Sequence, residues 1–197
     1  MQIQSCCLSR RFQGNFVDDS DMGYRFFREN ILVNGQTLTP FTTGIITMIR
    51  NDRDGEPISA HLLLSSLSIL STLDLYYPSF AQNLVQSTQS YYHSEAENLS
   101  MTMAPAKYIG HVDSRLRSEE QRCDRFFERQ SKREVMEVVQ NELITQVAED
   151  IIDKGFDDLV KSDDVDSLRM LYRLLILVKQ VDVMRTAWST YIKVFLT

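Results

Sequence analysis

The sequence predicts an all-α protein of about eight helices. Only 7 glycines and 4 prolines occur among its 197 residues, whereas sheet proteins need many such residues for their turns. Apolar residues also recur every three or four positions along most of the chain, which is the spacing of one helix face. With 43% hydrophobic and 24% charged residues, the composition is typical of a globular protein and argues against wholesale disorder.

Charge, cysteines and hydropathy narrow the class of protein. The net charge of −6 argues against nucleic acid as a partner, because nucleic-acid binders usually carry a basic surface. The three cysteines, Cys6, Cys7 and Cys123, are few and odd in number, which indicates reduced thiols. No apolar run approaches the roughly 20 residues that cross a bilayer, and residues 1–12 lack the apolar core of a signal peptide. We expect an intracellular protein, cytoplasmic, nuclear or both, with no membrane contact.

The first two helices are predicted from spacing and end signals. Residues 1–20 show no period and are interpreted as a loop or a disordered tail. Apolar residues from Met22 to Ile31 follow a helical spacing, and Asn34-Gly35 ends that helix. Pro40 opens a second helix, because proline suits the first helical position. The sequence Asp-Gly-Glu-Pro at 54–57 then predicts a tight turn between helices.

Three further helices occupy the middle of the chain. The segment from Leu62 to Leu75 is apolar on most faces, which predicts a buried helix. Tyr77-Pro78 starts a helix of about 22 residues. Ala104-Pro105 starts another helix, which extends to Phe127 and carries Cys123 on its apolar stripe.

The last third of the chain predicts three more helices. A capping box, Ser-x-x-Glu at 131–134, opens a helix whose apolar stripe runs to Gly155, a plausible residue just past its end. The motif Asp-x-x-Asp at 163–166 caps the next helix, which runs to Val178. A final helix covers 181–195.

No motif for catalysis or for cofactor binding is present. Neither the G-x-G-x-x-G nor the G-x-x-x-x-G-K-[ST] phosphate loop occurs. His61, His93 and His111 have no partner at metal-ligand spacing, and His111 does not face Asp113, two residues further along the same helix. We therefore expect no cofactor, no metal, no catalytic residue and no enzymatic activity.

The cysteines and one tyrosine–glutamate pair favour structural roles over chemical ones. Cys123 is interpreted as a small buried apolar residue and not as a reactive thiol. Cys6 and Cys7 are interpreted as part of a free tail. Tyr92 and Glu95 lie three residues apart and could touch on one helix face, as a structural contact.

The charged clusters are interpreted as solvated helix faces. The basic cluster comprises Arg115, Arg117, Arg122, Arg125, Arg129, Lys132 and Arg133. Acidic residues interleave with it at spacings that form surface ion pairs, namely Glu119, Glu120, Asp124 and Glu128. An acidic cluster follows at Asp157, Asp158, Asp163, Asp164 and Asp166. Its order differs from that of a calcium-binding loop, so we expect no calcium site there.

Four blocks of the sequence, taken in order, resemble the cullin family. They are GIITMIRNDRDGEPI (44–58), SFAQNLVQSTQSYYHSEAENL (79–99), KYIGHVDSRLRSEEQRCDRFF (107–127) and DSLRMLYRLLILV (166–178). The residues that match the family motifs are Ser79, Phe80, Thr88, Tyr91, Tyr92, Glu95, Tyr108, Val112, Arg115, Leu116, Glu119, Arg122, Met170–Tyr172 and Leu174. The segment DMGYRFFR (21–28) and the short gap before Ser79 look most like the cullin four type.

The resemblance implies an architecture. Cullins are elongated scaffolds of cullin–RING ubiquitin ligases, in which a stalk of three five-helix repeats holds substrate adaptors and a C-terminal domain holds the RING subunit. The resemblance covers the second repeat and part of the third, so it implies a right-handed stack of antiparallel helices that forms an incomplete solenoid. Residues 21–132 form one cullin-repeat-like unit, and residues 133–197 begin the next. Residues 1–20 have no counterpart.

The resemblance also implies a function. We expect a non-catalytic scaffold related to cullin–RING ligases, truncated at both ends, with ubiquitin ligase subunits as possible partners and no binding of the RING subunit. Lys193 lies in the wrong context to be the modified lysine of the family. The alternative is a free-standing all-α interaction module with no role in ubiquitin transfer. In either case we expect a partner-facing apolar patch, formed by Trp188, Tyr191, Ile192 and Phe195.

Overall fold

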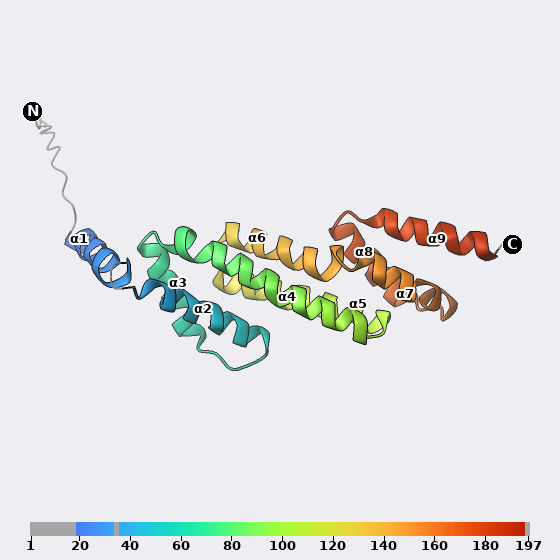
Figure 1. Cartoon of the computed structure of the whole chain (residues 1–197), viewed down its shortest axis with the longest axis horizontal. Coiled ribbons are helices and arrows are strands. Elements are labelled where there is room, and N and C mark those ends of the chain that lie inside the picture. Colours follow the sequence, from blue (N-terminus) through green and yellow to red (C-terminus); the bar gives the residue numbers. More distant parts are fainter. Residues whose placement is uncertain (1–18, 34–35, 196–197) are drawn as a thin grey trace, which may run out of the picture. The chain divides into compact units, whose positions relative to one another are not determined.

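The computed structural model describes residues 19–33 and 36–195, and in these ranges the chain forms nine α-helices and three π-helical segments, with no strand (Figure 1). The predicted all-α class is therefore confirmed. The predicted tail, residues 1–20, lies outside the described residues except for Asp19 and Ser20, which begin the first helix.

The chain divides into two compact units, Met1–Pro40 and Phe41–Thr197. In the first unit, α1 (Asp19–Phe26) continues into the π-helical segment η1 (Phe27–Val33). This confirms the helix predicted from Met22 to Ile31. Its predicted end signal, Asn34-Gly35, lies outside the described residues.

Helix α2 (Leu38–Arg53) begins two residues before Pro40. The prediction that Pro40 takes the first helical position is therefore wrong by two places. The proline is tolerated because the N–H groups of a first helical turn have no partner inside the helix. The tight turn after α2 is confirmed, since Gly55 adopts a φ of 82° and the N–H of Glu56 donates to the carbonyl of Asn51 at 2.9 Å.

Helix α3 (Ala60–Thr72) buries only one of its faces. Its buried apolar residues are Leu63, Leu67 and Leu70, whereas Leu62, Leu64 and Ile69 are between 42% and 54% exposed. The prediction of a helix buried all round is wrong for the second set. The run of leucines hides the period of the helix, so the sequence does not show that a single face is packed.

Helices α4 and α5 begin at prolines or close to them, as predicted. The π-helical segment η2 (Tyr76–Ala81) continues directly into α4 (Gln82–Thr102). Helix α5 (Pro105–Phe126) has Pro105 at its first position, and its predicted apolar stripe is buried. Only Met103 and Ala104 separate the two helices, so they run antiparallel.

Helix α6 (Arg129–Gln140) begins before the predicted capping box. Glu128 precedes its first turn and makes no side-chain cap, and Ser131 is the third residue of the helix and is fully buried. The predicted capping box is therefore wrong. A capping serine must lie outside the helix, whereas Ser131 lies inside the first turn of α6 and its side chain is buried.

The long helix predicted from 131 to Gly155 is two helices. Helix α6 continues through the π-helical segment η3 (Asn141–Thr145), the chain turns at 146–147, and α7 (Ala148–Lys161) follows. Gly155 lies inside α7 and does not end a helix, so this prediction is wrong. A Cβ atom at Gly155 would lie 2.3 Å from the Cβ of Pro105, and the glycine thus lets α7 approach the start of α5.

The chain ends with α8 (Val165–Leu177) and α9 (Val181–Phe195). The cap of α8 is Asp164, whose carboxylate accepts from the N–H of Ser167 at 3.1 Å. The prediction placed this cap at Asp163, which instead closes α7 with a φ of 55°. Within the second unit, α4, α5 and α6 pack together, and α7, α8 and α9 form a second group beside them (Figure 1).

None of the helices in the described part of the chain combines the length and apolar character needed to cross a bilayer.

Candidate functional site

Several side chains that carry the family motifs converge in a buried network between α2, α4 and α5. At its centre is Glu119 of α5, which is 0% exposed. Arg53 of α2 donates from Nη2 to Glu119 Oε1 at 2.6 Å and to the hydroxyl of Thr88 at 2.8 Å. Tyr92 donates its hydroxyl to Glu119 Oε2 at 2.7 Å, and Arg122 donates to the same oxygen. A single carboxylate thus joins three helices.

The spacing of the motifs explains how the network assembles. Thr88 and Tyr92 lie four residues apart on α4, and Glu119 and Arg122 lie three apart on α5, so the two members of each pair share a helix face. Arg53 is the last residue of α2, and its guanidinium carbon lies 5.4 Å from the ring centroid of Tyr92. The three helices therefore meet through a fixed set of donors and acceptors.

A second ion cluster extends the network towards solvent. Arg115 forms a bidentate pair with Glu95, with Nε–Oε1 at 2.7 Å and Nη2–Oε2 at 2.8 Å. His111 Nε2 lies 2.6 Å from Glu95 Oε1. Tyr91 donates its hydroxyl to Asp54 at 2.7 Å. The cluster therefore ties α4 and α5 to the turn that follows α2.

The predicted contact between Tyr92 and Glu95 is wrong. Tyr92 reaches Glu119, and Glu95 reaches Arg115, so both side chains of α4 bind α5 and not each other. Residues three apart on a helix share a face, but the neighbouring helix here offers each of them a stronger, charged partner.

The basic cluster divides into inward and outward residues. Arg115 and Arg122 turn into the network, as does Glu119 from the interleaved acidic residues, so the prediction of a solvated face is wrong for these three. Three ion pairs lie towards the exterior, Arg117–Asp113, Lys132–Asp124 and Arg133–Glu137, and of these only Lys132–Asp124 joins a basic residue to one of the acidic residues predicted as partners. Charge pattern alone does not show which face of α5 meets another helix.

Electrostatics keep the network ionised and balanced. Burial by itself would raise the pKa of Glu119, but the guanidinium groups of Arg53 and Arg122 hold it below its ordinary value. Burial, and then the Glu119 carboxylate, raises the pKa of Tyr92. Arg122 also binds Asp52, with Nε–Oδ2 at 2.5 Å. Two cations thus face two carboxylates, an arrangement suited to joining helices.

Within the part of the chain that the structure describes, the remaining candidates from the sequence are not brought together as a metal site. Among residues 19–33 and 36–195, no group of three or more His, Cys, Asp or Glu side chains is placed to hold a metal ion. Cys123 is fully buried, and burial raises the pKa of its thiol to about 12, as expected for a small buried apolar residue. Cys6 and Cys7 lie outside the described residues.

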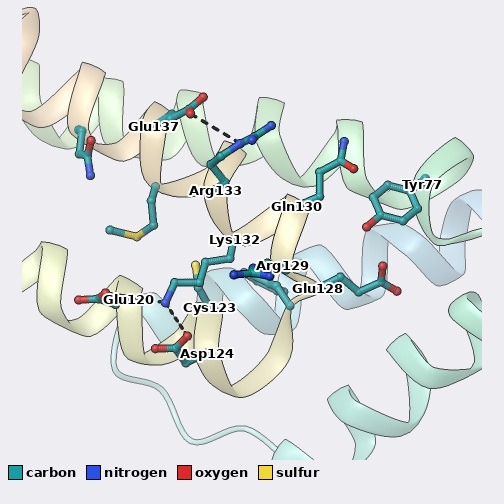
Figure 2. A pocket seen from close by; sticks show the side chains of 13 residues that line it. Tyr77, Glu120, Cys123, Asp124, Glu128, Arg129, Gln130, Lys132, Arg133 and Glu137 are labelled. Atoms are coloured by element: carbon teal, nitrogen blue, oxygen red, sulfur yellow. Dashed lines mark hydrogen bonds and ion pairs between the residues drawn. The ribbon is translucent and has the colours of Figure 1, made fainter.

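An open groove runs along the last turns of α5 and the whole of α6, and its volume is about 1050 Å³ (Figure 2). Lys132 crosses towards Asp124 on the α5 side, with Nζ–Oδ1 at 2.5 Å, and Arg133 pairs with Glu137 along α6 at 3.8 Å. Tyr77 stands at one end of the groove in Figure 2. Most of these charged side chains pair with one another. Among the residues that line the groove, no nucleophile is paired with a base.

The predicted partner-facing patch lies on α9 and is partly covered. Trp188 is 37% exposed, and its ring stands edge-on to Phe156 of α7, with the centroids 4.9 Å apart. Tyr191 lies in the same aromatic cluster, 6.4 Å from Phe156. Ile192 is 51% exposed. Phe195 is the last residue of α9, and its side chain lies outside the described part of the chain.

Comparison with known proteins gives one family. A family model described as the cullin alpha solenoid domain matches residues 7–196. The match begins within residues 1–20, for which the quoted motifs have no counterpart, and it runs through all the described helices.

Individual relatives are similar over most of this chain. Cullin-4A of Mus musculus is 30% identical over 176 residues, which are 89% of this chain and 23% of that protein. Cullin-4 of Dictyostelium discoideum is 28% identical over 173 residues, which are 88% and 21% of the two proteins. Cullin-3 of Dictyostelium discoideum is 24% identical, which is less than either cullin four relative. The predicted likeness to the cullin four type is therefore confirmed. The chain spans less than a quarter of the length of the first two relatives.

Proposed function

This chain belongs to the cullin family, and we propose that it acts as a non-catalytic helical scaffold segment in cullin–RING ubiquitin ligases. In such a role the segment would set the distance between other subunits, and any ubiquitin transfer would belong to the complex.

The observation that carries this proposal is the use of charged residues from the cullin-like blocks at 44–58 and 107–127. Arg53, Glu119 and Arg122 lie inside the protein and hold α2, α4 and α5 together. Here they contribute rigidity, which is the property that a spacer needs, because each helix is fixed to its neighbours.

The exposed apolar residues of α9 supply the proposed contact surface. Ile192 is 51% exposed and Trp188 is 37% exposed, next to the Phe156 ring that supports the tryptophan. Apolar side chains of this size contribute most when a partner removes them from water. We therefore assign the interaction with further ligase subunits to this face of α9.

Affinity purification from cells tests the scaffold and its surface together. The tagged chain is expected to retain ubiquitin ligase subunits, and Ile192→Glu is expected to lose most of them. Leu64→Glu is the matched control, because Leu64 is an apolar residue of similar exposure, 44%, on α3. Partners without any ligase subunit would contradict the scaffold proposal, and equal recovery with Ile192→Glu would contradict the α9 surface.

The RING subunit provides a separate test. Residues 1–197 expressed alone are expected not to retain it, because the motif resemblance covers the helical stalk only. Co-expression followed by size-exclusion chromatography measures this directly. A stoichiometric complex that stays together on the column would overturn the expectation.

The exposed face of α9 also favours one alternative, a free-standing interaction module that pairs with itself. In that case light scattering would give a dimer mass for the wild-type chain and a monomer mass for Ile192→Glu. No ligase subunit would then be recovered from cells.

A further inference from the structure

The segment η3, which joins α6 to α7, is wound more widely than an α-helix. The N–H of Gln146 donates to the carbonyl of Asn141, five residues back, at 3.0 Å. The wider turn brings three consecutive side chains inside, since Glu142, Leu143 and Ile144 are all at most 5% exposed. Three consecutive helical residues point in directions that cover most of a turn. Because all three are buried, neighbouring helices must enclose η3 on several sides.

The backbone of η3 is anchored to α5. In an α-helix the carbonyl of Leu143 would accept from the N–H of Val147, but that N–H bonds to the carbonyl of Ile144 at 3.2 Å. The hydroxyl of Tyr108 donates to the Leu143 carbonyl instead, at 2.9 Å. Tyr108 thus satisfies an acceptor that the wide turn has released.

The side chain of Glu142 is anchored to α4. Gln89 Nε2 donates to its Oε1 at 3.2 Å, and His93 Nδ1 lies 3.1 Å from its Oε2. Asn141 adds a third donor from the same segment at 3.2 Å. In the described part of the chain no lysine or arginine pairs with this carboxylate, and the only ionisable partner is His93, whose side chain is 64% exposed.

A buried carboxylate without a lysine or arginine partner costs free energy, because desolvation exceeds what neutral donors return. The hydrogen bonds of the Glu142 carboxylate, however, are directional and fix one arrangement of α4 and η3, which an apolar contact would not do.

We infer that Glu142, held by Gln89 and His93, is a lock that fixes the direction in which α7, and with it α8 and α9, leaves the α4–α6 group. The inference rests on the scaffold role proposed above, since a spacer needs a defined angle at each junction. The end of α6 lies beside α8 in Figure 1, so a change at η3 would move that second group.

Three variants separate a lock from simple filling of space. Glu142→Leu keeps the volume but removes every hydrogen bond. Glu142→Gln keeps an oxygen acceptor for Gln89 and Asn141, and its amide can donate to His93. Gln89→Ala combined with His93→Ala removes the exposed partners without altering the buried position. The matched control is Arg133→Gln, which breaks an exposed ion pair of α6.

Hydrogen exchange and distance measurements on the isolated chain test the lock. In Glu142→Leu and in the double variant, the amides of residues 142–147 are expected to exchange about tenfold faster, as for the loss of charged hydrogen bonds. Spin labels at Asn98→Cys and Ser189→Cys, with Cys6 and Cys7 replaced by serine, are expected to show a broader distance distribution. Glu142→Gln and the control are expected to match the wild type.

Unchanged exchange, or an unchanged distance distribution, in both Glu142→Leu and the double variant would overturn the lock. Because these measurements use the chain by itself, that result would leave the scaffold proposal standing. Conversely, failure to recover ligase subunits from cells would overturn the scaffold and leave the lock intact.

Discussion

At the scale of single residues, the second unit is organised around charges that the protein has buried and compensated. Glu119 accepts hydrogen bonds from Arg53, Arg122 and Tyr92, so the loss of any one donor leaves this buried carboxylate less well compensated. Surface ion pairs contribute little to stability because water screens them, whereas breaking one buried pair is costly. The motif residues are therefore the positions at which substitutions should have the largest effects.

Glu119→Gln is expected to lower the free energy of unfolding by about 3–5 kcal/mol, because it leaves the buried Arg53 without a compensating charge and Arg122 with Asp52 alone. Urea denaturation followed by circular dichroism measures this change. Glu120→Gln is the control. The side chain of Glu120 is 61% exposed, and its substitution removes only an ion pair with Lys132, in which Nζ and Oε1 are 3.7 Å apart. Equal effects of the two substitutions would contradict the role given to Glu119.

The same carboxylate predicts how stability depends on acid. Because the pKa of folded Glu119 lies below its ordinary value of 4.5, its contribution is present above that pH and is lost as the pH falls through the folded pKa. The difference in unfolding free energy between wild type and Glu119→Gln is thus expected to be constant from pH 7 to about pH 5 and to shrink below it. A difference that grows in acid would refute this assignment.

At the scale of helices, close approach and wide turns decide where each element lies. Gly155 and Pro105 bring α7 against the start of α5, and the released carbonyl of Leu143 is satisfied by Tyr108. Both features join the two groups of helices in the second unit. Neither feature can be predicted from the spacing of apolar residues along the chain.

Gly155→Ala is expected to destabilise the protein by about 1–3 kcal/mol, because the new Cβ overlaps the ring of Pro105 and overpacking is costly. Gly110→Ala is the matched control, since a Cβ atom there meets nothing within 4 Å. The control should stabilise the protein by about 1 kcal/mol, as alanine favours a helix interior over glycine. Thermal denaturation of both variants checks the opposite signs.

At the scale of the whole molecule, the core belongs to the second unit. Of the buried apolar residues in the described part of the chain, Leu32 alone precedes Ile45. The buried network also lies wholly within that unit, from Asp52 to Arg122.

Residues 38–197 are therefore expected to fold without the preceding segment. Circular dichroism should show a helical chain with one cooperative thermal transition, because small single domains with an intact core unfold in this way. The full chain is the reference. A broad transition without cooperativity would show that the first unit is required for the second to fold.

The sequence by itself determined the helical class, the family and the approximate place of most helices, with an exact start for α5 and α9. These features depend on local chemistry: prolines at helix starts, Gly55 at a turn, and motif spacing on one face. The buried network was not predicted, although Thr88–Tyr92 and Glu119–Arg122 were present as spaced, complementary pairs. A search for such pairs on neighbouring helices would have found it.

Tertiary structure alone decided which faces pack. It turned Arg115 and Arg122 inward, left Leu62 and Ile69 exposed, and divided the predicted long helix at η3. The physical reason is that a helix forms from local hydrogen bonds, whereas its buried face is chosen by the partners that other segments bring to it. Those partners lie tens of residues away, as Arg53 and Glu119 do, and local periodicity carries no record of them.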